Sequence, residues 1–291
     1  MKPAAFEYHR PASAADAVEL LATLGDDAKL LGGGQSLIPV LALRLAVFEH
    51  LIDIGRVDEL VGIERSDGTV RIGAGTTERA VEQSAEVAEA VPLLARATPY
   101  IGHVQIRNRG TVGGSLAHAD PAAEYPAVAL ALDAGFEALS PRGARTIAAR
   151  DFFTGLWSTA LEPDELLTGV TFPVWGGRCG FAVEEIARRH GDFAIAGAVV
   201  AVQLDADDRV ERCGIGLIGM GSTPERASDS EEGVLGSLVT EIDPAEVGRV
   251  AVADLDAIPA DLHGSASYRQ QVGATMVQRA WRRSVSEALD G

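Results

Sequence analysis

Three consecutive glycines, Gly32 to Gly34, constrain the fold more than any other feature of this 291-residue chain. They stand in LLGGGQSLIP, between the strand-like segment AKLL at 28–31 and a helix-like run from Leu37 to Leu45. Pro39 is tolerable in such a helix only because it falls in the first turn, where no N–H donor is needed. The segment therefore predicts a turn from a buried strand into a helix.

A second glycine segment, GTVGGSLAHADPAAE, extends from Gly110 to Glu124 and stands in a similar context. Successive N–H groups in a glycine-rich turn converge on one anion, and the positive end of a following helix adds to the attraction. Two such loops in one domain suit a ligand with two linked phosphates. They favour a dinucleotide site over the alternative that the glycines only make tight turns.

Neither segment matches a known short phosphate-binding motif. GGGQS lacks the Gly-Lys-Ser/Thr end of a P-loop, and neither it nor GAGTT at 73–77 completes the glycine spacing of a Rossmann loop. The expected dinucleotide site is therefore of another type.

Composition excludes several classes of function. The chain has 42 acidic and 25 basic residues, a net charge of −17, which disfavours nucleic acids and anionic membranes as partners. Its only cysteines, Cys179 and Cys213, are too few for a four-cysteine iron–sulfur or zinc centre, so we expect no metal site on this chain. The start MKPAAFEYHRP has no apolar signal core, and no apolar run is long enough to span a membrane. A cytoplasmic protein is predicted.

Strand-like and helix-like segments alternate along most of the chain, which predicts a mixed fold. SAADAVELLATLG at 13–25 reads as a capped amphipathic helix, and hairpins are expected around 66–68 and 141–143. The proline- and glycine-rich stretch TFPVWGGRCG at 171–180 is the best domain boundary. The segment 225–290 is expected to be mostly helical.

Five segments together resemble a known family, the FAD-binding medium subunits of molybdenum hydroxylases, the group of aerobic carbon monoxide dehydrogenase and xanthine dehydrogenase. The resemblance runs through FEYHRPASAADAVELL, LLGGGQSLIPVLALRLA, QIRNRGTVGGSLAHADPAAEYP, ELLTGVTFP and ARRHGDFAIAG. The order and spacing of these segments are far more specific than either glycine segment alone.

The resemblance implies an α+β fold. It predicts an FAD-binding domain of the vanillyl-alcohol-oxidase (PCMH) type at 1–175, built from two α+β subdomains at about 1–56 and 57–175. A small C-terminal α+β domain of the carbon monoxide dehydrogenase flavoprotein type is expected at 176–291.

The resemblance also implies a set of FAD-binding residues and no catalytic residue on this chain. Glu124 is expected to hydrogen-bond the sugar-alcohol chain of the flavin, and Leu167 and Phe193 are expected to pack near its isoalloxazine ring. The glycine segments would hold the diphosphate from two sides, and Asp120 lies within the second. The expected set is Gly32, Gly33, Gly34, Gln35, Ser36, Thr111, Gly113, Gly114, Ser115, Asp120, Glu124, Leu167 and Phe193.

Several of these residues have simpler interpretations. His118 and Asp120 look like an acid–base pair, but a polar pair that braces a turn is the favoured interpretation. Glu124 is equally suited to capping the helix that follows it. Phe193, next to Ala194, is equally suited to the core of a strand.

The chain departs from the family pattern at two places. Ser115 stands where many relatives have asparagine, and the serine keeps a polar side chain at this position. Glu184 and Glu185 occupy a stretch where relatives often have a lysine, which removes a positive charge that would stabilise reduced flavin.

The function implied by the resemblance is electron transfer within a complex. The low number of cysteines agrees with this, because the iron–sulfur clusters would belong to another subunit. Substrate would be oxidised at a molybdenum cofactor on a large subunit, and electrons would pass through [2Fe–2S] clusters on a small subunit to FAD on this chain and then to an external acceptor. A doubled, heterohexameric assembly is expected. Carbon monoxide, an N-heterocycle, an aldehyde and a purine all stay open as substrates. The alternatives are a self-contained FAD-dependent oxidase and a non-catalytic dinucleotide-binding or assembly protein.

Overall fold

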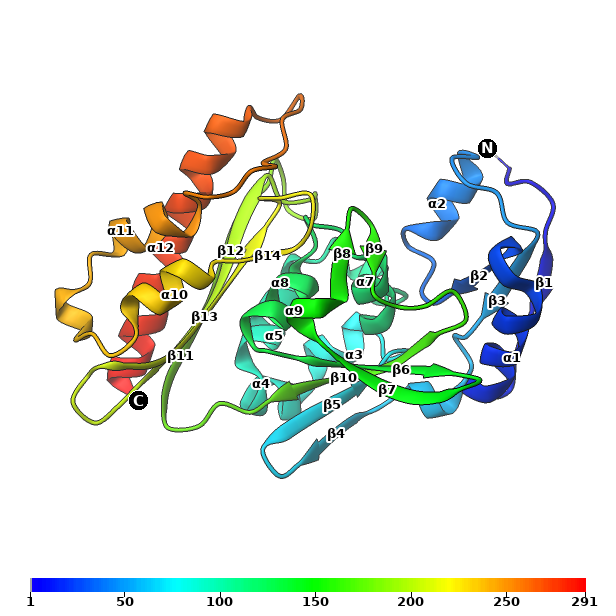
Figure 1. Cartoon of the computed structure of the whole chain (residues 1–291), viewed down its shortest axis with the longest axis horizontal. Helices are drawn as coiled ribbons and strands as arrows, with labels where there is room; N and C mark the ends of the chain where they lie inside the picture. Colours follow the sequence, from blue (N-terminus) through cyan, green and yellow to red (C-terminus); the bar gives the residue numbers. More distant parts are fainter. Residues whose placement is uncertain (1) are drawn as a thin grey trace.

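The computed structural model describes residues 2–291, which form three successive lobes, each built around its own β-sheet. The N-terminal lobe and the C-terminal lobe lie at opposite ends of the molecule, and the central lobe lies between them (Figure 1).

The N-terminal lobe contains a parallel sheet with strand order β1-β3-β2. The Ser13 side chain accepts the Asp16 N–H at the start of the first helix, which ends at Gly25 as predicted. The helix after the glycines is shorter than expected, because the chain turns to a positive φ of 58° at Arg44. The elements are β1 Glu7–His9, α1 Ala14–Leu24, β2 Ala28–Leu31, α2 Leu37–Ala42 and β3 His50–Asp53.

The central lobe contains a five-stranded antiparallel sheet with strand order β4-β5-β10-β6-β7. Both predicted hairpins are confirmed, as β4–β5 and β6–β7. The elements are β4 Ile63–Ser66, β5 Thr69–Gly73, α3 Glu78–Gln83, α4 Ala85–Ala90, α5 Pro92–Ala97, α6 Val104–Arg107, α7 Val112–His118, α8 Glu124–Ala131, β6 Gly135–Ser140, β7 Gly143–Ala148, α9 Ala149–Phe152, β8 Phe153–Gly155, β9 Ser158–Thr159 and β10 Leu166–Pro173.

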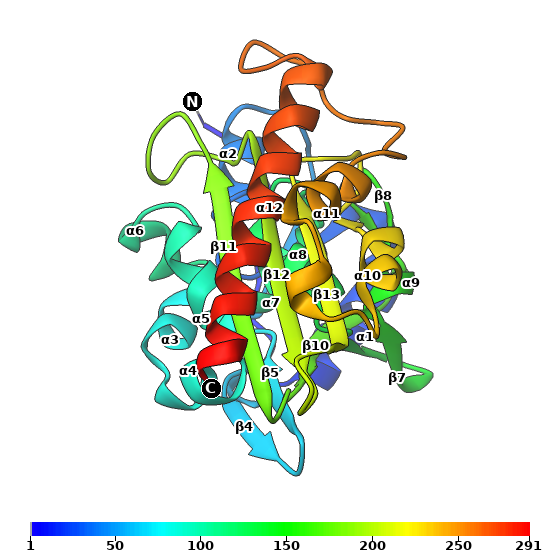
Figure 2. The same ribbon diagram turned by 90° about the vertical axis from the view of Figure 1, so that its left-hand side faces the viewer.

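The C-terminal lobe contains an antiparallel sheet with strand order β11-β12-β13-β14. The long helix α12 lies along this sheet, with α10 and α11 beside it (Figure 2). As predicted, the last part of the chain is mostly helical. The elements are β11 Arg178–Ile186, β12 Ala196–Leu204, β13 Val210–Ile218, β14 Glu225–Arg226, α10 Ser228–Val234, α11 Pro244–Ala251 and α12 Ala266–Asp290.

The central and C-terminal lobes share one continuous core. Every residue of α8 is buried, and Val199 of β12 belongs to the same apolar cluster as this helix. The neighbouring Val200 belongs to a second cluster, together with Trp281 of α12. Successive side chains of β12 are thus buried on opposite faces of the sheet. Burial of each valine contributes about 1.5–3 kcal/mol to the free energy of unfolding.

A polar contact also joins these two lobes. Arg96 of α5 donates to Glu287 of α12 at 2.6 Å and 2.5 Å, and the same carboxylate accepts the Phe181 N–H of β11 at 2.9 Å. The shared core and this ion pair hold the C-terminal lobe against the central lobe, so a cavity between them has rigid walls.

Candidate functional site

The first glycine segment begins where β2 ends. β2 pairs with β3 as far as Leu31, and the segment Gly32–Ser36 leads into α2, as the sequence predicts. Gly34 has a φ of 73°, a conformation that side chains with a β-carbon rarely adopt. The Gln35 amide donates to the Gly33 carbonyl oxygen at 2.9 Å and braces the turn from within.

Most backbone amides of this segment have no hydrogen-bond acceptor in the part of the chain that the structure describes. Among residues 2–291, the N–H groups of Gly33, Gly34, Gln35 and Ser36 donate to no backbone or side-chain acceptor. Ser36 is the N-cap of α2, yet its side chain makes no cap hydrogen bond. Four successive free donors form a site suited to an anion, because N–H groups near the surface need either water or a ligand.

The second glycine segment differs from the expected loop. Gly113 and Gly114 lie in the first turn of α7, which begins directly after an N-cap at Thr111. The Thr111 side chain accepts the Gly114 N–H at 3.1 Å. This cap stabilises the start of the helix at Val112, so both glycines are helical. The N–H groups of Val112 and Gly113 donate to backbone carbonyl oxygens at 2.9 Å and 2.8 Å, so few amides of this segment are free.

The two segments contact each other directly. A β-carbon added to Gly33 would lie 2.0 Å from the Arg109 carbonyl oxygen and 2.7 Å from the Gly110 Cα. One added to Gly32 would lie 3.0 Å from the Thr111 Oγ1. The structure thus brings the first nine predicted residues to one place, although about 80 residues of chain separate the two segments.

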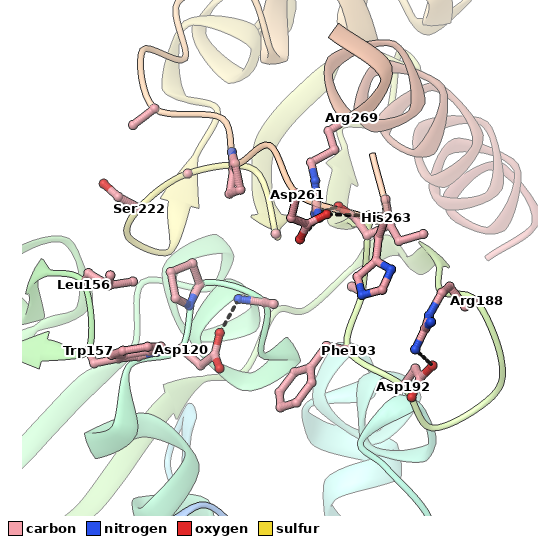
Figure 3. A pocket seen from close by; sticks show the side chains of 18 residues that line it. Asp120, Leu156, Trp157, Arg188, Asp192, Phe193, Ser222, Asp261, His263 and Arg269 are labelled. Atoms are coloured by element: carbon pink, nitrogen blue, oxygen red, sulfur yellow. Dashed lines mark hydrogen bonds and ion pairs between the residues drawn. The ribbon is translucent and has the colours of Figure 1, made fainter. Parts of the chain in front are cut away.

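A cavity of about 610 Å³ lies between the central and C-terminal lobes. It contains two of the predicted residues, Asp120 and Phe193, whereas Gly32–Ser36 and Thr111–Ser115 do not line it. In Figure 3, Asp120 and Phe193 lie on one side of this space and Asp261, His263 and Arg269 on the other. Its volume is in the range of pockets that hold cofactors and other small molecules.

Two aromatic side chains stand exposed at this cavity. Phe193 lies between β11 and β12 and is 71% exposed, so the interpretation of Phe193 as strand core is wrong. Trp157, in the turn between β8 and β9, is 61% exposed and lies at the far edge of the same space (Figure 3). Sequence reasoning missed Trp157, which has a positive φ of 53° and no motif around it. Exposed aromatic rings are costly in water and are typical of sites that bind a flat ligand.

The Asp120 side chain braces a turn, as the favoured interpretation predicted. Its Oδ1 accepts the Ala122 N–H at 2.9 Å, while its Oδ2 is 4.0 Å from the His118 Nε2. The His118 ring is parallel to the Trp157 ring, with 6.3 Å between their centroids. Burial lowers the pKa of His118, so the imidazole is neutral at pH 7 and fills space behind the aromatic side of the cavity.

Three buried carboxyl groups lie behind the site. Burial raises the pKa of Glu78 to about 8 and that of Glu185 to about 7. Burial also raises the pKa of Glu124 well above its usual range, and the nearby Glu185 adds to the shift. Glu124 is the first residue of α8 and only 7% exposed, and the cap position is Ala123, so Glu124 is not the N-cap. At pH 7 desolvation keeps Glu78 and Glu124 largely protonated, whereas Glu185 is partly ionised.

Leu167 is the predicted residue that the structure places apart from the others. It lies in β10, paired with Ala138 of β6, and is only 4% exposed. Its side chain belongs to the apolar core of the central lobe and does not line the cavity. Its expected contact with a flavin stays a prediction.

The two glutamates that depart from the family pattern have different environments. Glu184 accepts from Arg283 of α12 at 2.5 Å, so its charge is compensated within the chain. The Glu185 Oε2 is buried, with no hydrogen-bond partner among the described residues. Because burial raises the pKa of Glu185 to about 7, the pair adds less negative charge near pH 7 than two exposed carboxylates would.

The wall of the cavity opposite Phe193 is held by one buried cation. Arg269 of α12 is 5% exposed and donates to Asp261 at 2.7 Å and to the Ile195 carbonyl oxygen. These contacts fix the segment before α12 onto the end of β12 and give the cavity a rigid outer side.

Comparison with known proteins identifies the family and the fold. Residues 4–175 match a family described as the FAD-binding domain in molybdopterin dehydrogenase. The chain belongs to this family. Residues 181–284 match the carbon monoxide dehydrogenase flavoprotein C-terminal domain. Membership makes the chain the FAD-binding part of an oxidoreductase of that class, and it confirms the resemblance noted in the sequence.

Individual members of the family are similar over nearly their whole length. The chain is 42% identical to subunit alpha of the 6-hydroxypseudooxynicotine dehydrogenase complex of Paenarthrobacter nicotinovorans, over 99% of this chain and 97% of that one. It is 40% identical to the carbon monoxide dehydrogenase medium chain of Afipia carboxidovorans, over 99% of both chains.

A solved structure confirms the α+β fold class. Carbon monoxide dehydrogenase from Hydrogenophaga pseudoflava, in a form that lacks the Mo-pyranopterin moiety, superposes with a TM-score of 0.95 at 40% identity, over 99% of both chains. None of the helices in residues 2–291 combines the length and the apolar character that crossing a bilayer requires.

The residues present fit an FAD molecule. A diphosphate needs hydrogen-bond donors, which the free amides of Gly33 to Ser36 supply without any lysine. A flat ring system needs apolar or aromatic surfaces, which Phe193 and Trp157 supply at the cavity. The direct contact between the two glycine segments gives the diphosphate site a rigid base.

Proposed function

We propose that this chain holds one noncovalent FAD and serves as the electron-exit subunit of a molybdenum hydroxylase complex. The proposal rests chiefly on the run of free amides from Gly33 to Ser36, packed against the backbone of the second segment. FAD supplies a carrier that accepts two electrons and passes them to an external acceptor. The residues of this chain bind it, orient it and limit the access of water.

Within this proposal most of the predicted residues have a physical task. The amides of the first segment donate to the diphosphate, and Thr111 and Ser115 border it from the second segment. The exposed Phe193 ring covers one side of the flavin. Asp120 lies near the polar edge of the flavin, and Glu124 hydrogen-bonds its sugar-alcohol chain. The domains proposed are 1–175 for FAD, with subdomains at about 1–56 and 57–175, and 176–291 for the C-terminal domain; the matched ranges 4–175 and 181–284 support them.

The partners proposed are a large molybdenum-binding subunit and a small [2Fe–2S] subunit, in a doubled heterohexamer. The names of the relatives support a complex, since one is a medium chain and another a subunit of a dehydrogenase complex. Cys179 and Cys213 are free thiols and cannot hold a four-cysteine cluster, so the clusters belong to another chain. Free thiols also favour the cytoplasmic location that we include in the proposal.

The decisive experiment uses the native complex, purified with its companions and analysed for metals and flavin. We expect about one FAD per chain, released intact by denaturation, and flavin absorbance that bleaches with substrate and recovers with an acceptor. The chain freed of its partners should stay oxidised with the same substrate. Reduction of the isolated chain by an organic substrate would instead establish a self-contained oxidase, and a complex without flavin would establish an assembly protein.

A further inference from the structure

Three potential metal ligands meet on the N-terminal sheet, outside the glycine segments and the cavity. They are Glu7 and His9 of β1 and His50 of β3, and one ligand atom from each lies within 4.8 Å of the other two. Sequence analysis did not single them out, because 41 residues separate His9 from His50. None of them has a part in the proposed flavin site.

Strand register explains why the three side chains meet. β1 and β3 are parallel, with Glu7 paired to His50. Side chains two residues apart in a strand point to the same face, so His9 joins Glu7 on that face. Tyr8 points to the opposite face, where its hydroxyl donates to Asp53.

Two of the three separations between ligand atoms are close to those of a tetrahedral zinc site. Bonds of about 2.0–2.2 Å to imidazole nitrogen and carboxylate oxygen place ligand atoms about 3.3–3.6 Å apart. The His9 Nε2 and the His50 Nδ1 are 3.1 Å apart, and the His50 Nδ1 and the Glu7 Oε2 are 3.5 Å apart. The third separation, between Glu7 and His9, is within 4.8 Å, so the side chains must move inward to bring all three ligand atoms to one ion.

The site is partly preorganised and open to solvent on one side. The His50 side chain is 18% exposed, and the residues that follow it in β3, Leu51 and Ile52, are fully buried and hold the strand in place. The Glu7 side chain is 74% exposed, which leaves room for a water molecule as a fourth ligand. The net charge of −17 favours the approach of a cation.

A hydrogen bond between the two imidazole rings is the simpler explanation of their contact. That bond accounts for the 3.1 Å separation but not for the position of the Glu7 carboxylate at 3.5 Å from the same His50 nitrogen. Two imidazoles and one carboxylate are a set typical of zinc sites with an open position.

We propose that Glu7, His9 and His50 bind one Zn²⁺ ion, with water as the fourth ligand. The ion ties the edge strand β1 to the central strand β3. β3 also pairs with β2, whose end leads into the first glycine segment, so the ion stabilises the lobe that carries this segment.

The test uses the full chain in its native complex, freed of zinc while the partners keep their metals, and titrated with zinc chloride against a chromophoric chelator. We expect one high-affinity Zn²⁺ per chain beyond the metals of the partners, a higher unfolding temperature with zinc, and the strong visible absorption of tetrahedral cobalt when Co²⁺ replaces zinc. His9→Gln and His50→Gln should each weaken binding by more than about 100-fold, since loss of an outer partner alone costs about 10- to 100-fold.

Two further variants separate a lost ligand from a damaged fold. Glu7→Gln changes a side chain that is 74% exposed and keeps its size, and it should weaken binding at least about tenfold. Glu49→Gln removes a neighbouring exposed carboxylate that is not a ligand and should leave affinity unchanged. Unchanged zinc affinity in Glu7→Gln and His9→Gln, or wild-type binding only at millimolar zinc, would overturn the proposal.

Discussion

The two glycine segments are similar in sequence, but their backbones have different roles. In Gly32–Ser36, four successive N–H groups have no acceptor among the described residues. In Thr111–Ser115, the N–H groups from Val112 onward donate to the Thr76 and Ala74 carbonyls and to the oxygens of Thr111. The first segment keeps its donors for a ligand, whereas the second uses them to begin α7 against the end of β5.

Glycine is required in both segments, but for different physical reasons. In the first, Gly34 adopts a positive φ that turns the chain and leaves the amides free. In the second, Gly113 lets the helix approach β5 so closely that an added β-carbon would lie 2.4 Å from the Ala74 β-carbon. Variants of the first segment should therefore lose cofactor first, and those of the second should lose stability first.

The largest effect on FAD is expected from Gly33→Val. The new side chain would collide with the Arg109 carbonyl oxygen and push the free amides away from the second segment. Losing two hydrogen bonds to a charged diphosphate, each worth about 1.5–3 kcal/mol, weakens binding at least about 100-fold. Flavin per chain in the purified complex measures this. Gly176→Val is the control, because a β-carbon added there would meet no atom within 4 Å. Equal flavin content in both variants would contradict the role of the free amides in binding FAD.

The largest effect on stability is expected from Gly113→Val. Overpacking against Ala74 at a buried position costs about 3 kcal/mol of unfolding free energy. Urea denaturation of the apoprotein measures it. Gly114→Val is the matched comparison, because Gly114 is exposed and its β-carbon would meet only the Thr111 Oγ1. Gly114→Val should keep most of the stability, and the opposite ranking of stabilities would show that the two glycines have exchanged roles.

A pH-dependent effect is expected at Glu78, whose carboxyl packs against Gly110 behind the second segment. Burial raises its pKa from 4.5 to about 8, so the folded state holds more protons than the unfolded state between these values. The stability that this group contributes is fully present below about pH 4.5 and is lost as pH rises through 8. Glu78→Gln should therefore gain stability relative to wild type as pH rises from 5 to 9. Unfolding temperatures across this range measure it, and a constant difference would contradict the raised pKa.

A smaller loss of stability is expected from Thr111→Ala. This change removes the cap on the Gly114 N–H and costs about 1 kcal/mol of unfolding free energy. Thr111→Ser keeps the oxygen and should retain most of the stability. Equal stability of the serine and alanine variants would mean that the cap contributes nothing.

The smallest effect is expected from Ser36→Ala. The Ser36 hydroxyl is exposed and makes no cap hydrogen bond, so the unfolding temperature should not change. A single hydroxyl contact to a ligand is worth about 0.5–1.5 kcal/mol, so FAD should bind about two- to tenfold more weakly. Isothermal titration of the apoprotein with FAD measures it, and a loss as large as that of Gly33→Val would mean that side chains rather than amides hold the diphosphate.

Local patterns in the sequence predicted the elements and the family. The cap at Ser13, the turn after β2 and both hairpins follow from residues within a few positions of one another. Such signals depend on backbone preferences and side-chain period, which the chain carries at short range. The order of five motifs was enough to indicate an FAD-binding subunit, and the family match confirms it.

Only the tertiary structure decided which donors are free and which side chains meet. The Gly113 amide is used because Ala74, the residue after β5, supplies its carbonyl oxygen, whereas the Gly33 amide has no acceptor among the described residues. Trp157 joins the cavity, and His9 meets His50, through contacts between distant parts of the chain. Long-range contacts depend on how sheets and helices pack, which no short pattern encodes, so the amino-acid sequence determined the kind of ligand and the packing decided how this chain holds it.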